Sequence, residues 1–121
     1  MPTKRQSLGT WGETIALKFL VRRGDILITR NYRTRYGELD LVTRRGDAIV
    51  FTEVKTRRTD AYGLPETAVT ESKQRRLIKI ALTYLAAHPE HDGDWQIDVI
   101  AVRPAAGLAP EIVHFENAVT G

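Results

Sequence analysis

The 121-residue sequence contains no cysteine, only two serines and no long hydrophobic run. Without cysteine the chain cannot form disulfides, thiolate zinc sites or a catalytic thiol. Neither serine lies in a nucleophile-elbow sequence, and P-loop and G-x-G-x-x-G motifs are also absent. Covalent serine chemistry and nucleotide-driven chemistry are therefore not expected. Because Lys18 interrupts the apolar stretch near the N-terminus, we predict no signal peptide, no membrane span and a cytoplasmic location.

The composition is typical of an ordinary globular domain, with 42% hydrophobic and 27% charged residues. At this length we expect a single domain over residues 1–121, with a core at about 8–103 and a C-terminal extension, 104–121, that has room for an edge strand. Charge is unevenly distributed. Residues 1–79 have a charge balance of +8 and residues 80–121 a balance of −5, so the first part favours a polyanionic ligand.

Hydrophobic periodicity predicts two helices and a central sheet. Trp11, Ile15 and Phe19 form one helical stripe, and Thr70 can cap a second helix. The resulting α-β-β-β-α-β order predicts an α/β fold with a mixed β-sheet flanked by helices. The expected helices span 10–23 and 70–87; the expected strands span 25–33, 37–42, 49–55 and 95–102; loops are expected at 57–69 and 104–110, and an edge strand at 112–115.

Asp40, Glu53 and Lys55 interrupt two adjacent apolar runs that we expect to pair as a hairpin. Acidic residues are depleted in strands, and a half-buried carboxylate is costly unless a cation or hydrogen-bond donors compensate its charge. If the hairpin turns at Gly46-Asp47, Asp40 lies directly across from Glu53. If it turns at Arg45-Gly46 instead, Asp40 lies one pair along. Both registers put the three side chains on one face, because side chains alternate along a strand.

Facing carboxylates repel, so this arrangement requires compensating positive charge. Lys55 supplies one charge, and a divalent ion would supply two more. Oxygen ligands suit Mg²⁺ or Mn²⁺, which could orient a phosphate and activate a water in a phosphodiester displacement. The alternative is a strand pair with solvated acids on an open face and an ordinary salt bridge from Lys55.

Six motifs occur in order around this hairpin. They are Gly12-Glu13, Arg30-Asn31-Tyr32-Arg33, Gly37-Glu38-Leu39-Asp40, Phe51-Thr52-Glu53-Val54-Lys55-Thr56-Arg57, Lys73-Gln74-Arg75-Arg76 and Ile97-Asp98-Val99-Ile100. The spacing from Asp40 to Glu53-Val54-Lys55 resembles the D…(D/E)xK signature of the PD-(D/E)XK nuclease superfamily. The whole set resembles the bacterial YraN family, whose fold resembles that of archaeal Holliday-junction resolvases. This resemblance covers about residues 8–102 and implies a restriction-endonuclease-like core.

The resemblance also implies a metal-dependent nuclease site. Asp40 and Glu53, with the Val54 carbonyl, would bind Mg²⁺ or Mn²⁺, and Lys55 would be the catalytic lysine. In relatives a glutamate of the first helix and a glutamine of the second complete the site. Residues of these types occur in the corresponding motifs, and they are Glu13 and Gln74.

Both of these supporting residues have another interpretation. Glu13 can close a capping box that begins at Thr10, and Gln74 can be a buried amide bound to nearby backbone. Asp98 interrupts an otherwise apolar strand, where we expect it to accept hydrogen bonds within the core rather than to bind a metal.

Cations flank the proposed site in the sequence and predict contacts with nucleic acid. Tyr32, Tyr36 and Tyr62 lie among them and could stack on bases. We therefore expect a deoxyribonuclease, with branched DNA as the favoured substrate and a homodimer as a plausible state, since resolvases make two cuts. The alternatives are a non-catalytic nucleic-acid-binding or adaptor protein that retains the fold and, less favoured, a small-molecule phosphohydrolase. The expected nucleic-acid-binding residues are Arg30, Arg33, Arg35, Arg57, Arg58, Lys73, Arg75 and Arg76.

Overall fold

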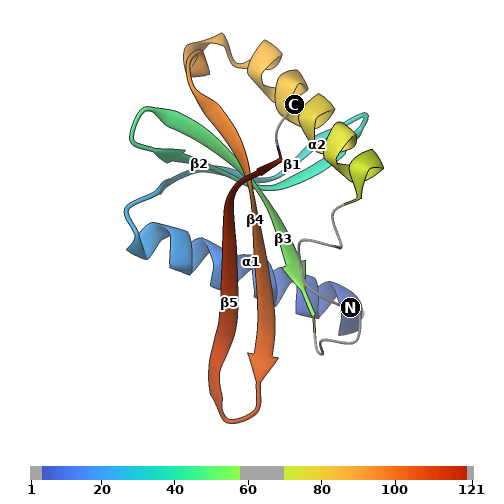
Figure 1. Ribbon diagram of the computed structural model, residues 1–121, viewed down its shortest axis with the longest axis vertical. Coiled ribbons are helices and arrows are strands. Elements are labelled where there is room, and N and C mark those ends of the chain that lie inside the picture. The colour runs from blue at the N-terminus through green and yellow to red at the C-terminus, as the bar shows by residue number, and fades with distance from the viewer. Residues whose placement is uncertain (1–3, 58–69, 120–121) are drawn as a thin grey trace.

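The computed structural model describes residues 4–57 and 70–119 (Figure 1). Arg58 and Tyr62, which we expected to contact nucleic acid, lie outside these residues. No helix in the described part of the chain is long and apolar enough to cross a membrane. The elements are α1 (Lys4–Arg22), β1 (Ile26–Thr34), β2 (Gly37–Arg45), β3 (Ala48–Thr56), α2 (Glu71–Ala87), the 3₁₀ helix η2 (Pro89–His91), β4 (Trp95–Ala105) and β5 (Leu108–Val119).

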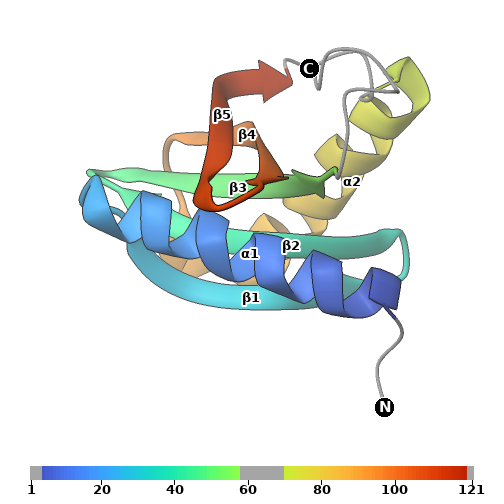
Figure 2. The ribbon, with the colours of Figure 1, turned by 90° about the horizontal axis from the view of Figure 1, so that it is seen from below.

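The five strands form one mixed sheet in the order β1-β2-β3-β4-β5. Neighbouring strands are antiparallel except β3 and β4, which are parallel and are joined through the segment that contains α2. The two helices lie on opposite faces of the sheet (Figure 2). This arrangement confirms the predicted α/β fold, with a mixed sheet flanked by helices as in a restriction-endonuclease-like core.

Each face of the sheet has its own hydrophobic core. On one face, Leu77 and Tyr84 of α2 pack with Phe51 of β3. On the other face, Leu20 of α1 packs with Leu41 of β2. The two helices therefore fix the predicted hairpin of β2 and β3 from opposite faces, because each helix buries large apolar side chains against the sheet.

The hairpin between β2 and β3 turns at Gly46-Asp47, as one of the two predicted registers requires. Gly46 has φ of +62°, a conformation that glycine adopts without steric cost. Leu41 pairs with Thr52, and this register, carried one position further, would place Asp40 across from Glu53. The two carboxylates therefore approach each other from adjacent strands.

Two sequence-based boundaries are wrong. Helix α1 begins at Lys4, not at residue 10, because its polar first turns carry no apolar stripe that would reveal them. Thr10 therefore lies inside the helix, where its carbonyl accepts a hydrogen bond from Thr14 Oγ1 at 3.0 Å. This excludes the capping box that begins at Thr10. Glu13 is a residue of the helix interior.

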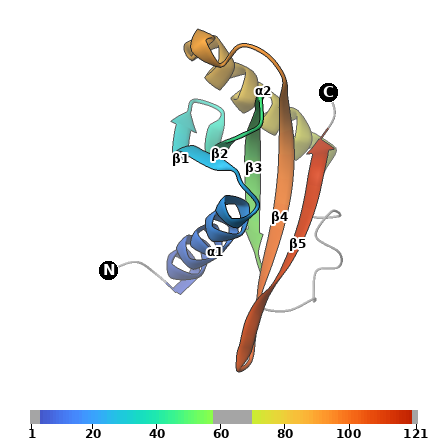
Figure 3. The ribbon, with the colours of Figure 1, turned by 90° about the vertical axis from the view of Figure 1, so that its left-hand side faces the viewer.

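The loop expected at 104–110 is also wrong. β4 and β5 continue through most of it, leaving a short turn, and together they form an arm that extends beyond the end of β3 (Figure 3). Pro104 lies where the β4–β5 register shifts, and Pro110 lies in an edge strand. Bulges and edge strands tolerate proline, since a ladder hydrogen bond from its nitrogen is not needed there. The predicted edge strand is present but longer than expected.

Candidate metal centre

β1 and β2 both depart from regular strand geometry at the candidate site. Asn31 has φ of +56°, and the β1–β2 register places it opposite Asp40. Leu39 packs in the α2 core whereas Leu41 packs in the α1 core, although a regular strand would turn both side chains to the same face. β2 therefore twists at Asp40. The carboxylate of Asp40 reaches β3, where its Oδ2 accepts a hydrogen bond from the Val54 N–H at 2.7 Å.

Several carboxylates meet around Asp40. One carboxylate oxygen from each of Glu13 of α1 and Glu38 and Asp40 of β2 lies within 4.8 Å of the other two. Burial, together with the charges of Glu53, Glu13 and Glu38, raises the pKa of Asp40 to about 8 against the opposing effect of the Val54 hydrogen bond. At neutral pH this carboxyl therefore holds a proton unless further positive charge arrives.

The nearby cations pair with the carboxylates that surround Asp40. Glu53 Oε1 lies 3.1 Å from Lys55 Nζ and 3.5 Å from Lys73 Nζ, and all three side chains are mostly buried. Glu13 Oε1 lies 3.7 Å from Arg30 Nη2. Burial nevertheless raises the pKa of Glu13 above its ordinary value, and Glu38 adds to the increase. The site thus remains rich in negative charge.

The helices bring further predicted residues to this region. Gly12 packs directly on β3, since a Cβ at this position would lie only 1.8 Å from Thr56 Oγ1, and this close approach brings Glu13 to the sheet. Gln74 is half-buried in the first turn of α2, directly after Lys73. The structure therefore gathers Glu13, Asp40, Glu53 and Lys55, with the first turn of α2 beside them.

The sequence analysis did not assign two residues of this site, Glu38 and Asn31. Glu38 shares its strand with Asp40 at a spacing of two, and that spacing is a signal that could have included it. Asn31 gives no such signal, apart from the tolerance of asparagine for positive φ. Lys73, which we expect to contact nucleic acid, lies 3.5 Å from Glu53 Oε1.

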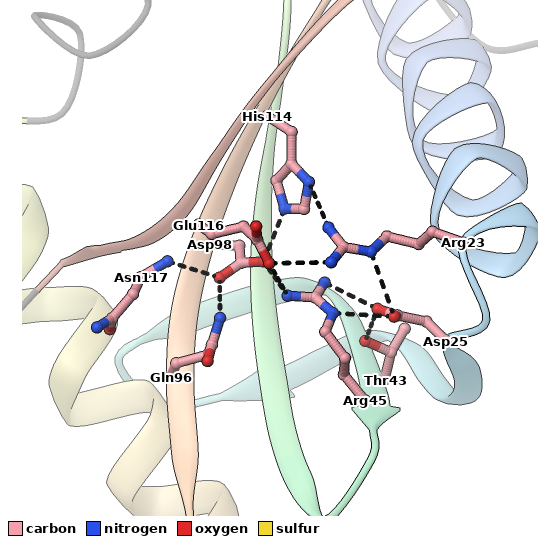
Figure 4. A network of polar contacts seen from close by, with 9 residues as sticks. All are labelled: Arg23, Asp25, Thr43, Arg45, Gln96, Asp98, His114, Glu116 and Asn117. Atoms are coloured by element: carbon pink, nitrogen blue, oxygen red, sulfur yellow. Dashed lines mark hydrogen bonds and ion pairs between the residues drawn. The ribbon is translucent and has the colours of Figure 1, made fainter.

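A second acidic cluster lies near the β2–β3 turn (Figure 4). Asp98, His114 and Glu116 also have potential metal-ligand atoms within 4.8 Å of one another. Here, however, Nη1 of Arg45 lies 2.9 Å from both Asp98 Oδ2 and Glu116 Oε1, while Nε and Nη2 of the same guanidinium donate to Asp25 at 2.9 Å. The guanidinium fills the position between the acids that a metal ion would need.

Histidine and backbone groups complete this second network. Nη1 of Arg23 lies 3.1 Å from Nδ1 of His114; because a guanidinium only donates, Nδ1 accepts and Nε2–H donates to Asp98 at 2.7 Å. Burial acts to raise the pKa of Asp98, but hydrogen bonds from the Asn117 N–H, Gln96, His114 and Arg45 hold it below its ordinary value. The prediction that Asp98 accepts hydrogen bonds within the core is confirmed.

Comparison with known proteins identifies the family. The family model described as uncharacterised protein family UPF0102 matches residues 12–102. The chain belongs to the UPF0102 family. A UPF0102 protein of Rhodococcus opacus (strain B4) is 44% identical over 112 residues, 93% of this chain and 95% of its own. A UPF0102 protein of Geobacter metallireducens is 44% identical over 118 residues, 98% of this chain and 96% of its own. This confirms the resemblance to the YraN family.

The remaining predicted nucleic-acid-binding residues of this UPF0102 member lie on β1 or in the turn after it, on α2 and directly after β3. Arg33 is 87% exposed and lies 3.3 Å from Glu38. Arg75 and Arg76 are exposed on α2, and Arg57 is half-buried at the end of β3. Exposed Arg75 and Arg76 can therefore reach a ligand, although Arg75 also lies 3.7 Å from Glu71, whereas Lys73 and Arg33 pair with acids of the site.

The predicted stacking tyrosines have different environments. Tyr32 packs edge-on against the ring of Tyr84, with 5.0 Å between ring centroids, and belongs to the α2 side of the core. Tyr36 accepts a hydrogen bond from Nη2 of Arg35 at 2.8 Å, and that guanidinium lies 4.9 Å from the ring centre. Of these two rings, Tyr36 is the one that already combines an aromatic face with a cation.

Proposed function

We propose that this chain is a Mg²⁺- or Mn²⁺-dependent nuclease that hydrolyses DNA phosphodiester bonds. The observation that carries the proposal is the electrostatic state of Asp40, a carboxyl whose pKa is raised to about 8 by burial and by Glu53, Glu13 and Glu38. A divalent cation would displace the proton of this carboxyl and offset the repulsion among the carboxylates. Strongly perturbed carboxyls are also typical of functional sites.

The residues present fit such an ion. Mg²⁺ and Mn²⁺ prefer oxygen ligands and usually take one or two carboxylates together with water and substrate phosphate. Asp40 and Glu53 would hold the ion with the Val54 carbonyl, and Glu13 and Glu38 add carboxylate oxygens close to Asp40. When bound, the ion would lower the pKa of a bound water and offset charge that develops at phosphorus.

The lysines and the glutamine would act on the water and the phosphate. The Nζ atoms of Lys55 and Lys73 lie 3.1 and 3.5 Å from the same atom, Glu53 Oε1. When Glu53 shares its charge with an ion, the Lys55 ammonium can hold the attacking water or neutralise a phosphate oxygen. Gln74, in the same helical turn as Lys73, would orient the water or the scissile phosphate.

The proposed substrate is DNA, because the basic surplus extends well beyond a single phosphate site. Exposed Arg75 and Arg76 continue that surplus along α2, and Arg35 presents a cation against Tyr36. The likeness to Holliday-junction resolvases favours branched DNA, and a homodimer would supply two cuts. The competing proposal is a non-catalytic nucleic-acid-binding or adaptor protein.

The test is cleavage of end-labelled linear, single-stranded and four-way DNA in Mg²⁺ or Mn²⁺. We expect metal-dependent products from the wild-type protein and none from Asp40→Asn or Glu53→Gln. Asp47→Asn, which changes an exposed acid in the β2–β3 turn, serves as the matched control and should cleave normally. Activity that survives both site substitutions would remove this mechanism, and binding without cleavage in either metal would favour the adaptor.

A further inference from the structure

Asn31 links the two glutamates of the acidic cluster. In the orientation that turns its amide nitrogen toward the acids, this nitrogen donates to Glu13 Oε1 and to Glu38 Oε1, both at 2.9 Å. The opposite orientation would set the amide oxygen against two carboxylates. Asn31 therefore bridges a carboxylate of α1 and a carboxylate of β2 from its place on β1.

The backbone of β1 is shaped for this bridge. Asn31 has φ of +56°, and asparagine is one of the few residues besides glycine that tolerate this region. Backbone strain of this kind persists where the surroundings impose it, and it clusters at functional sites. On either side of Asn31, Arg30 pairs with Glu13 and Arg33 pairs with Glu38. The segment thus contacts both glutamates by charge and by hydrogen bonds.

We propose that Asn31 is a positioning residue that holds Glu13 and Glu38 with their oxygens directed to the metal position beside Asp40. This inference rests on the proposed function, because it needs a cation at the cluster. Without the amide, the two glutamates repel each other and gain rotamer freedom, both of which oppose the arrangement within 4.8 Å. Partners that orient ligands in this way typically contribute about 10- to 100-fold to metal affinity.

The decisive variant is Asn31→Gly, because glycine keeps the positive φ and removes the side chain that carries the amide. The chain offers a matched control in Asn117, the other described non-glycine residue with positive φ, at +50°. Asn117 binds Asp98 through its backbone N–H, which Asn117→Gly retains. The two variants make the same chemical change in the same backbone conformation, one inside the acidic cluster and one in the second network.

Mn²⁺ binding to the full-length protein, measured by calorimetry and by the loss of the free-ion electron paramagnetic resonance signal, is the primary readout. We expect Asn31→Gly to weaken Mn²⁺ binding by about 10-fold or more and Asn117→Gly to bind as the wild type does. Thermal melting without metal should differ little between the two variants. Wild-type Mn²⁺ affinity in Asn31→Gly, equal losses in both variants, or unfolding of Asn31→Gly alone would overturn the inference.

A double-mutant cycle separates positioning from a general structural effect. If Asn31 acts through Glu38, then Asn31→Gly should weaken Mn²⁺ binding less in a Glu38→Gln background than in the wild type. Fully additive losses would overturn the inference. Its failure is also distinct from failure of the proposed function. If the wild type binds Mn²⁺ and Asp40→Asn does not, while Asn31→Gly binds normally, only the proposed role of Asn31 is refuted. If the wild type binds no Mn²⁺, both proposals are refuted.

Discussion

Replacing Asp40 with asparagine should stabilise the metal-free protein, and the gain should grow as the pH rises from 6 to 8. The carboxyl has a pKa of about 8 in the folded protein against an ordinary value of 3.8. Between these values the folded state binds one more proton than the unfolded state, so the free energy of unfolding falls with pH by up to about 1.4 kcal/mol per unit. Asparagine has no such proton, and its amide oxygen can still accept from the Val54 N–H.

The magnitude follows from the titration of this one group. The stabilisation is fully present below the unfolded pKa and is lost as the pH rises through the folded pKa. At pH 6 nearly every folded molecule keeps the proton, whereas at pH 8 half have lost it, which corresponds to a loss of about 2 kcal/mol over this interval. Above pH 9 the contribution of Asp40 should level off, because both states are then ionised.

Urea denaturation in EDTA at pH 6, 7, 8 and 9 measures this difference for the wild type, Asp40→Asn and the control Asp47→Asn. The gap between the wild type and Asp40→Asn should widen by about 2 kcal/mol from pH 6 to pH 8, while the control follows the wild type. Mn²⁺ at 100 times its dissociation constant should restore about 2.7 kcal/mol to the wild type and little to Asp40→Asn. Parallel pH curves for the two proteins would refute the electrostatic reasoning.

Two further predictions concern parts of the fold that support the site. Gly12→Ala brings a Cβ within 1.8 Å of Thr56 Oγ1 and should lower the free energy of unfolding in urea by about 1–3 kcal/mol. Gly9→Ala, in the same helix with open space around it, should raise the free energy of unfolding by about 0.5–1 kcal/mol. Equal effects of the two substitutions would contradict the close packing at Gly12. Arg45→Ala leaves Asp98 and a second buried aspartate without their shared cation and should cost about 3–5 kcal/mol at neutral pH. A loss below about 1 kcal/mol, as for an exposed ion pair, would show that the network contributes little.

The order of helices and strands could be predicted because apolar runs mark the strands and most turns between them carry glycine. The Gly46-Asp47 turn even fixes the β2–β3 register that leads up to Asp40, whose side chain reaches β3. The predicted boundaries are wrong where these signals are missing or misleading. The first turns of α1 are polar, and Pro104 and Pro110 suggested a loop although a bulge and an edge strand accept them.

The full acidic cluster could not be predicted because it depends on a break in the period of two. The positive φ of Asn31 and the twist at Asp40 place Leu39 and Leu41 in different cores. The spacing of two predicts Glu38 beside Asp40, but regular alternation cannot predict the other neighbours that Asp40 meets. The contribution of Glu13 depends in addition on how closely α1 approaches β3, which is a matter of tertiary packing.

The two acidic clusters of this chain have similar composition and opposite electrostatic states. At Asp98, hydrogen bonds and the Arg45 guanidinium outweigh burial, and the pKa is lowered. At Asp40, burial and like charges prevail, and the pKa is raised to about 8, while nearby cations pair with the surrounding glutamates. Stability alone would favour filling both clusters with a guanidinium. An acidic cluster left short of positive charge costs folding free energy, and a divalent cation at Asp40 would recover it, which is why we locate the function there rather than at Asp98.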